Sequence, residues 1–309
     1  MRQGLRRLRY GGKDDKKRKI RGYKMTEKKQ VVTVIGLGVI GGSYAMALKK
    51  LGYTVYGVDC DPDTVAKAKE RGIADDAATS AEAFVPLSDI VVIALYPKQV
   101  EGELRKIRDL LKEGVVVTDV AGIKSHFTQK ILALMPANTD FVFAHPMAGR
   151  EKKGIDYADD RVFKGANFII TPSENNKKSS LETVERLARE MGFKNVMRLT
   201  PEQHDKIISF VSQLPHALAV ALVNSDDRQF DTPRFVGDSY RDLTRIANIN
   251  ESLWSELFLG NKDNLLSSIR EFEKCLDVLK EALENEDKET LEREFVRATK
   301  RRTEFNKEL

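Results

Sequence analysis

The feature that most constrains the fold is a short apolar run that leads directly into a glycine-rich turn. The run is VVTVI, residues 31–35, and the turn is GLGVIGG, residues 36–42. β-Branched residues favour a buried strand, and the helical pattern that follows the turn ends at Gly52. A second strand-like run, TVYGVD, follows at residues 54–59. Strand, glycine-rich turn, helix and strand in this order predict a dinucleotide-binding βαβ unit.

The glycines of this turn fit the pattern G-x-G-x-x-G. Gly36 permits the tight turn, Gly38 leaves room for a pyrophosphate, and Gly41 lets helix and strand pack closely. Asp59 closes the second strand, where a carboxylate binds the ribose hydroxyls and repels a 2′-phosphate. We therefore predict NAD rather than NADP; a glycine turn without a ligand is the alternative. The predicted cofactor-binding residues are Gly36, Leu37, Gly38, Val39, Ile40, Gly41 and Asp59, with Tyr96, Pro97 and Asp119 at the ends of later strands.

The rest of the chain divides into two patterns. Up to about residue 200, apolar strand-like runs alternate with helical patterns, as in a doubly wound α/β sheet. From Pro201 to Leu309, apolar residues recur at helical spacing with hardly a strand-like run. We predict a Rossmann-type domain over residues 31–200 and an all-helical domain over residues 201–309. By analogy with other folds, such a helical half packs against its twin in a homodimer.

The net charge of the chain comes from its first residues. Residues 1–24 hold eleven Lys and Arg and two Asp, a net charge of +9, so the remainder carries −4 of the total of +5. Such a stretch is able to bind nucleic acid or an acidic membrane surface, but it lacks the apolar core of a secretory signal. We interpret residues 1–30 as a disordered leader or as an extension upstream of a true start at Met25, and we assign it no function.

Apolar runs and cysteines limit the class of protein further. No uninterrupted apolar run approaches the roughly 20 residues that span a bilayer. Cys60 and Cys275 lie far apart and show no metal-ligand spacing. These features predict a cytoplasmic protein without a metal site and without nucleic-acid or membrane partners.

The four histidines occupy different contexts. His145 ends the strand-like run FVFAH at the cofactor edge of the sheet, so it is either a general base or a strand-end histidine bonded to a backbone carbonyl. His126 and His204 lie near helix starts and are expected at capping or surface positions. His216 follows Pro215 inside an apolar helix, where the missing backbone hydrogen bond costs about 3 kcal/mol and the resulting kink helps to shape a site or an interface.

Two arginines in the helical half are candidates for binding an acidic substrate. Arg241 and Arg245 are four residues apart, so we expect them on one helix face. They form either a solvated stripe or a pair that binds carboxylates through bidentate contacts.

Four motifs together resemble the prephenate dehydrogenase family of tyrosine biosynthesis: GLGVIGGS, HPMAGRE, SQLPHALAVAL and YRDLTRIA followed by Trp254. The resemblance runs from about residue 31 to about residue 265. It implies NAD-dependent oxidative decarboxylation of prephenate, a dianion, to 4-hydroxyphenylpyruvate. The alternatives are an arogenate dehydrogenase, another 3-hydroxyacid-type dehydrogenase with a catalytic lysine, and a non-catalytic NAD-binding regulator.

The resemblance also implies roles for individual residues. His145 would be the catalytic base, Arg245 would bind a substrate carboxylate, and His216 would line the substrate pocket. The other implied substrate-binding residues are Gly122, Lys124, Glu151, Ser212, Arg241, Asp242 and Trp254. One position departs from the family pattern D-x-x-S-x-K, because DVAGIK has Gly122 where a serine would support the catalytic histidine. The sequence therefore leaves the support of His145 open.

Overall fold

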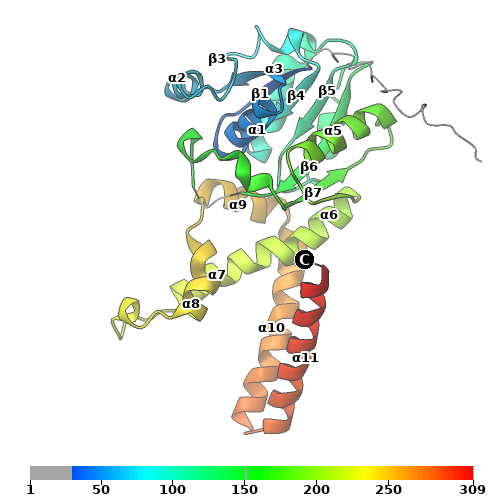
Figure 1. The fold of residues 1–309 in the computed structure, drawn as a ribbon. Helices are drawn as coiled ribbons and strands as arrows, with labels where there is room; N and C mark the ends of the chain where they lie inside the picture. The colour runs from blue at the N-terminus through cyan, green and yellow to red at the C-terminus, as the bar shows by residue number, and fades with distance from the viewer. Residues whose placement is uncertain (1–29, 150–151, 309) are drawn as a thin grey trace, which may run out of the picture.

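The computed structural model describes residues 30–149 and 152–308, and it places a sheet domain above a helical domain (Figure 1). The eight strands form one sheet in the order β3-β2-β1-β4-β5-β6-β7-β8. They are β1 (Val31–Ile35), β2 (Thr54–Val58), β3 (Asp76–Ala78), β4 (Ile90–Ile93), β5 (Val116–Asp119), β6 (Asp140–Met147), β7 (Asn167–Thr171) and β8 (Asn195–Arg198). The predicted basic leader, residues 1–30, lies outside the described part of the chain, apart from Gln30.

The sheet is parallel from β3 to β6, and β7 then runs antiparallel to β6. The predicted doubly wound sheet is therefore confirmed, with two reversed strands, β7 and β8, that the pattern of apolar runs did not indicate. Pairing of β6 with β5 ends at Val142, whereas pairing with β7 continues from Phe143 to Met147. β6 consequently carries His145 beyond the edge of its parallel neighbour, held from one side by β7.

Helices cover both faces of the sheet. They are α1 (Val39–Lys50), α2 (Pro62–Glu70), α3 (Pro97–Ile107), α4 (Thr128–Leu132) and α5 (Lys178–Glu190). Val91 and Val92, neighbours on β4, are both fully buried in opposite apolar cores, one formed with α3 and the other with α1 and α5. This explains why the central strands read as continuous apolar runs rather than as alternating patterns.

The helical domain begins with a nearly continuous rod. It consists of α6 (Pro201–Ile208), a π-helical segment (Ser209–Gln213) and α7 (Leu214–Asn224). Pro215 lies in the first turn of α7, directly after the π-helical segment. The expected disturbance around this proline is thus a widened turn, a feature that often occurs at functional sites.

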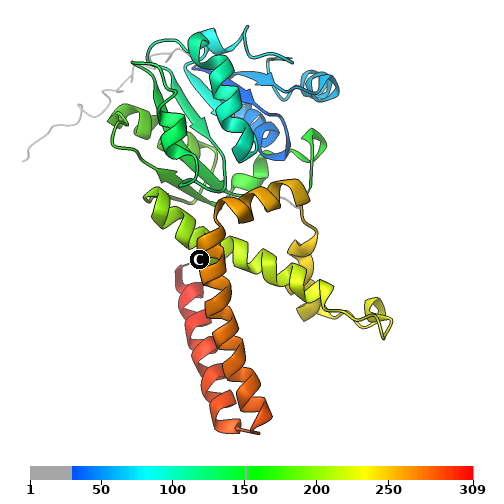
Figure 2. The same cartoon turned by 180° about the vertical axis from the view of Figure 1, so that it is seen from behind.

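The remaining helices are α8 (Asp238–Thr244), α9 (Glu251–Gly260), α10 (Lys262–Glu284) and α11 (Lys288–Glu308). Among them, α9 packs against the sheet domain, where Leu257 joins one of its apolar cores, and the others extend away from the sheet. The two views show α10 and α11 side by side as a long hairpin, while α7 and α8 form an arm that points in another direction (Figures 1 and 2). Exposed apolar side chains occur on both, namely Leu222, Val223, Phe235, Leu243, Leu276, Leu283, Phe295 and Val296.

The rod of α6 and α7 also has the length and composition of a membrane span. Its 24 residues have a mean hydropathy of 1.5 in the most apolar window, of which 28% is buried. One helix of this kind is weak evidence for a membrane protein. His204, Asp205 and Gln213 are buried polar residues on it, and each bonds to another part of the chain.

Candidate active site

A cavity of about 530 Å³ lies between the carboxyl ends of the parallel strands and the helical domain. The sheet domain contributes the glycine-rich turn, Tyr96, Pro97, Gly122 and His145, and the helical domain contributes Ser212, His216, Asn250, Trp254 and Leu257. Ligands of open α/β sheets bind at this edge of the strands. The cavity therefore joins the predicted cofactor turn and most of the predicted catalytic side chains.

The glycine-rich turn has the geometry that a bound dinucleotide needs. Gly36 has a φ of +91°, and a Cβ there would lie 2.5 Å from the carbonyl oxygen of Ala94. A Cβ on Gly41 would lie 1.8 Å from the carbonyl oxygen of Gly36, so these two positions require glycine. Around Gly38, by contrast, a Cβ would meet nothing within 4 Å. This open space at the start of α1 fits a pyrophosphate held by helix N–H groups.

Asp59 braces this turn from the end of β2. Its carboxylate accepts hydrogen bonds from the backbone N–H groups of Leu37, at 2.8 Å, and Asp61, at 3.0 Å. The neighbouring Cys60, Asp61 and Pro62 bring no cation that would hold a 2′-phosphate. The residues present therefore fit a dinucleotide with a free ribose hydroxyl, as in NAD.

Beneath His145 lies a fully buried ion pair. The ammonium of Lys124 donates to Asp119 Oδ2 at 2.5 Å, to the carbonyl of Ala144 at 2.7 Å and to the carbonyl of Ala121 at 2.9 Å. Burial lowers the pKa of Lys124, while the neighbouring carboxylate of Asp119 opposes that shift. Asp119 Oδ1 also accepts from the backbone N–H of Ala144 at 3.0 Å. The pair thus ties the end of β5 to β6 one residue before His145.

This arrangement changes the interpretation of two predicted residues. Asp119 was predicted to bind the cofactor and Lys124 to bind substrate, but both side chains are 0% exposed and neither lines the cavity. All three protons of the ammonium already meet protein acceptors. In this structure both residues therefore lie beneath the floor of the cavity and support it.

His145 is hydrogen bonded to a second histidine. Its Nδ1 lies 2.9 Å from Nε2 of His204, and Nδ1 of His204 lies 2.7 Å from Oδ1 of Asp205. The carboxylate of Asp205 also accepts from the backbone N–H groups of Lys124 and Ser125, each at 2.8 Å. The alternative of a bond from His145 to a backbone carbonyl is thus replaced by a buried side-chain network.

The capping or surface position expected for His204 is wrong, because its side chain is completely buried. Thr200 caps α6 instead, and its hydroxyl accepts from the backbone N–H of Gln203. With the cap supplied by Thr200, the first turn of α6 directs His204 inward against β6. Its partner lies 59 residues away in sequence, so no local pattern reveals the contact. His126, by contrast, is exposed as expected.

Both imidazoles of this network favour their neutral form. Burial lowers the pKa of His145 well below 6.5, and the neighbouring His204 and Lys124 lower it further. Burial also lowers the pKa of His204, against the opposing effect of Asp205. Burial by itself would raise the pKa of Asp205, but the hydrogen bonds it accepts, first from His204, bring that pKa below its usual value. A neutral His145 is a competent proton acceptor at neutral pH.

Gly122 faces the other ring nitrogen of His145. A Cβ at position 122 would lie 3.6 Å from His145 Nε2 and 3.3 Å from Cδ2 of Leu257. The expected serine is thus absent from the cavity side of the imidazole. The support that the sequence left open comes from the opposite nitrogen, through His204.

The helical wall presents an aromatic surface. The rings of His216 and Trp254 stack with centroids 3.7 Å apart and an interplanar angle of 28°. His216 Nδ1 donates to the carbonyl of Ser212, at 2.8 Å, within the widened turn. Asn250 Nδ2 donates to the hydroxyl of Tyr96, at 2.8 Å, and thereby links the two domains across the cavity.

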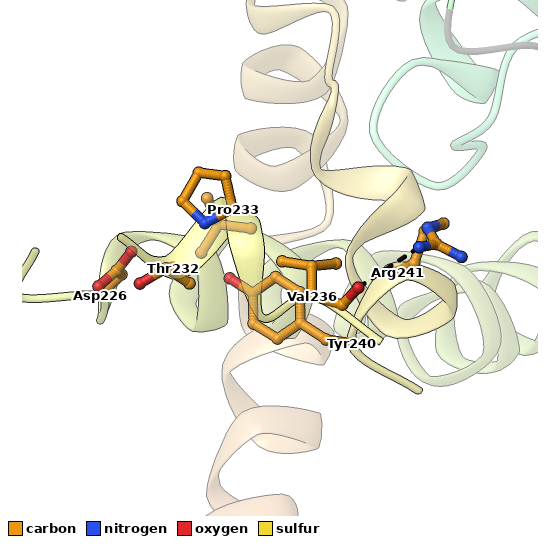
Figure 3. A pocket seen from close by; sticks show the side chains of 7 residues that line it. Asp226, Thr232, Pro233, Val236, Tyr240 and Arg241 are labelled. Atoms are coloured by element: carbon orange, nitrogen blue, oxygen red, sulfur yellow. Dashed lines mark hydrogen bonds between the residues drawn. The ribbon is translucent and has the colours of Figure 1, made fainter. Parts of the chain in front are cut away.

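The predicted arginines occupy a different place. α8 ends at Thr244 and continues directly into a 3₁₀ turn (Arg245–Ala247), so Arg245 begins this turn, whereas Arg241 lies within α8. Arg241 pairs with Asp238 at 2.5 Å and lines a separate cavity of about 430 Å³ between α7 and α8 (Figure 3). Asp242 and Arg245 are exposed and do not line the cavity of His145. Glu151 lies outside the described residues.

Two lysines that the sequence reading missed do line the cavity. They are Lys152 and Lys153, directly after the motif HPMAGRE. Lys153 pairs with Glu251 at 3.0 Å, and the ammonium of Lys152 lies 5.4 Å from the ring centroid of Tyr157. Their position in the sequence, directly after the histidine motif, could have indicated that they lie near the site. Within residues 30–149 and 152–308, no group of three or more His, Cys, Asp and Glu side chains is arranged to hold a metal.

Comparisons with known proteins agree with this site. Residues 44–197 match the family model of the prephenate dehydrogenase nucleotide-binding domain, and residues 200–297 match that of the prephenate dehydrogenase dimerization domain. The chain is 31% identical over 281 residues to a prephenate dehydrogenase of Bacillus subtilis, covering 88% of this chain and 75% of the relative.

Solved structures show the same two-domain fold. A prephenate dehydrogenase from A. aeolicus, in complex with hydroxyphenyl propionate and NAD+, matches with a TM-score of 0.82 and 32% identity, over 90% of this chain and 99% of that one. An arogenate dehydrogenase from Synechocystis matches with a TM-score of 0.76 and 26% identity, over 89% and 99% of the two chains. The fold and the family resemblance predicted from the sequence are confirmed: the chain belongs to the prephenate dehydrogenase family of oxidoreductases.

Proposed function

We propose that this enzyme oxidatively decarboxylates prephenate to 4-hydroxyphenylpyruvate with NAD as the hydride acceptor. The observation that carries the proposal is the cavity itself, which joins an NAD-type glycine turn, a neutral histidine and an aromatic wall. The relative from Bacillus subtilis, named a prephenate dehydrogenase, supports the substrate, and the NAD+ bound to the A. aeolicus enzyme supports the cofactor.

The reaction breaks three bonds around one ring. The C4 hydroxyl loses its proton, the hydrogen on C4 leaves as hydride, and the ring carboxylate leaves as CO2. The electrons of the broken carbon–carbon bond complete the aromatic ring. NAD, when bound along the glycine turn, accepts the hydride.

His145 moves the proton in this scheme. Its Nε2 accepts the hydroxyl proton as the C4 oxygen becomes a carbonyl, and it returns that proton to the oxygen once the ring is aromatic. The proton is thus conserved over the cycle, which requires a base that is neutral at rest. General-base assistance of this kind typically contributes about 10²–10⁴-fold to the rate.

The remaining predicted site residues have roles around the substrate. The stacked rings of His216 and Trp254 offer an apolar face to the ring of prephenate, with Ser212 and Gly122 beside it. Arg245 binds a carboxylate from the rim, since the next residue, Ile246, lines the cavity. Arg241, Asp242 and Glu151 belong to the charged surroundings of the entrance.

We further propose a homodimer formed through the helical domain. The exposed apolar side chains of the arm and of the α10–α11 hairpin, together with the match to a dimerization domain, support this assembly. The end of β8 at Arg198 and the start of α6 at Pro201 support a domain boundary at residue 200. The free, exposed thiols of Cys60 and Cys275 suit the reducing cytoplasm.

An arogenate dehydrogenase is the second candidate. The two substrates share the ring and differ only in a keto or an amino group on the side chain. The structural similarity to the Synechocystis arogenate dehydrogenase supports arogenate as the alternative substrate. Steady-state kinetics on both substrates, compared through kcat/KM, separate the two.

NADH formation tests the enzyme directly. The purified full chain with prephenate and NAD+ should produce NADH, and His145→Asn should lower kcat by about 10²–10⁴-fold while NAD still binds. His126→Asn is the matched control, because His126 is exposed and outside the cavity. NAD binding without turnover of prephenate or arogenate would refute the enzymatic assignment.

A further inference from the structure

A chain of hydrogen bonds starts at the carboxylate of Asp205 and ends at the imidazole of His145. Asp205 accepts from two backbone N–H groups and contacts His204 Nδ1 at 2.7 Å. An ionised carboxylate has only acceptors. The hydrogen in the contact between Asp205 and His204 therefore belongs to Nδ1 of His204.

The next contact fixes the tautomer of His145. Because His204 is neutral with its hydrogen on Nδ1, its Nε2 carries a lone pair. That lone pair faces Nδ1 of His145 at 2.9 Å, and two lone pairs at this distance would repel each other. The hydrogen of His145 must therefore lie on Nδ1, which leaves Nε2 unprotonated toward Gly122 and the cavity.

We propose that His204 and Asp205 are positioning residues that hold His145 in the tautomer with its hydrogen on Nδ1, so that Nε2 is the base that faces the substrate. The identity of the reaction that this base serves rests on the function proposed above. The direction of each hydrogen bond between Asp205, His204 and His145 follows from the single negative charge on Asp205.

The same series of hydrogen bonds stabilises His145 once it is protonated. When Nε2 takes up a proton, the imidazolium of His145 donates a charge-assisted bond from Nδ1 to His204, and His204 in turn donates to Asp205. A third group that orients and stabilises a base in this way is a recurring arrangement in other enzymes. The other charges that face this cluster are Lys124 and Asp119, which neutralise each other in a buried pair, and Lys152 and Lys153 across the cavity.

Nitrogen NMR of the full chain with ¹⁵N-labelled histidine tests the tautomer without any turnover. Ring nitrogens with and without hydrogen have well separated chemical shifts, and the four histidines give a simple spectrum. The signals lost in His145→Asn identify His145. We expect a protonated Nδ1 and an unprotonated Nε2 at neutral pH. The opposite tautomer in the wild-type protein would overturn the proposal.

Substitutions test the kinetic consequence. His204→Leu removes the acceptor and should lower kcat by about 10²-fold, the lower end of general-base effects, with KM and NAD affinity within about twofold. His204→Gln returns a side-chain oxygen that accepts from Nδ1 of His145, and should restore kcat to within about tenfold of wild type. His126→Leu is the control on an exposed histidine. Equal loss in the Leu and Gln variants, or no loss in either, contradicts the assigned role.

Asp205→Leu tests the role of the carboxylate in ordering the hydrogen bonds. It removes the acceptor that keeps hydrogen on Nδ1 of His204, so neither imidazole is held in one tautomer. We expect the NMR signals of His145 to change to a mixture of tautomers and kcat to fall, while an unchanged single tautomer would count against Asp205.

The two proposals fail separately. A protein that turns over neither prephenate nor arogenate, yet shows His145 with hydrogen on Nδ1, refutes the proposed function and leaves the tautomer assignment intact. An active protein with hydrogen on Nε2 of His145 supports the proposed function and refutes the tautomer assignment.

Discussion

The surroundings of His145 and the arginine arm are built in opposite ways. Around His145, the side chains of Asp119, Lys124, His204 and Asp205 are at most 1% exposed, and each is bonded within the chain. On the arm, Arg241 and its partner Asp238 are 63% and 90% exposed. Dense burial fixes the imidazole of His145 within the chain, whereas the arm presents its charges to solvent, where the proposed substrate carboxylate or a second copy of the chain can reach them.

This difference has an energetic consequence. A buried ion pair leaves an uncompensated charge when one partner is removed, whereas an exposed pair is already solvated. The same chemical change, the loss of one cation, should therefore have very different effects on the stability of the fold in the two regions.

Lys124→Met should produce the largest effect on stability. It leaves the carboxylate of Asp119 buried without its cation and should lower the free energy of unfolding by about 3–5 kcal/mol. Arg241→Ala, the matched loss of a cation on the arm, should change it by about 0–1 kcal/mol. Urea unfolding of both variants checks the comparison. Similar values for the two would mean that burial does not distinguish the regions.

Arg245→Ala should separate binding from stability. Loss of a hydrogen bond to a charged carboxylate is worth about 1.5–3 kcal/mol, so kcat/KM for prephenate should fall by about 10- to 100-fold, mainly through KM. The free energy of unfolding should change little, since the residue is exposed. Arg234→Ala on the same arm is the control, because Arg234 pairs locally with Asp231. An unchanged KM in Arg245→Ala would remove Arg245 from the substrate site.

The sequence revealed what is encoded locally. The strand, glycine turn and helix follow from neighbouring residues, and so does the position of His145 at the end of β6. The inward turn of His204 depends on how α6 packs against β6, and the direction of β7 depends on pairing with a strand some 20 residues earlier. Lys124 was found by its motif, but its burial depends on contacts with Ala144 and Asp119 that no motif describes. Side-chain roles that arise from tertiary packing therefore need the structure.

The buried histidines should make the fold sensitive to moderate acid. Burial lowers the pKa of both His145 and His204, so the folded state binds their protons only below the unfolded value of about 6.5. Above that value both states are neutral and stability does not depend on these groups. As the pH falls below it, the unfolded chain takes up protons that the folded chain does not.

Stability should therefore fall from pH 6.5 toward pH 5 by up to about 1.4 kcal/mol per pH unit for each histidine. Carboxylates such as Asp205, whose pKa is lowered, add their own loss only nearer to their unfolded value of about 3.9. Thermal unfolding at a series of pH values measures the slope, and His145→Asn should reduce it in this window. An equal slope in the variant would show that His145 does not titrate with unfolding.

Gly122→Ser should give the smallest effect and the finest test of how the base is supported. The added Cβ would lie 3.6 Å from Nε2 of His145, within ordinary contact, and Leu257 need move only a few tenths of an ångström to admit it. The new hydroxyl can hydrogen bond to Nε2, but that nitrogen already has its orientation from His204 on the opposite side of the ring. We therefore expect kcat to change by less than about tenfold, the equivalent of one neutral hydrogen bond of about 1 kcal/mol. Gly122→Ala, which adds the Cβ without the hydroxyl, separates crowding from hydrogen bonding. A rise of about 10²-fold or more in the serine variant alone would mean that His204 and Asp205 leave His145 insufficiently held.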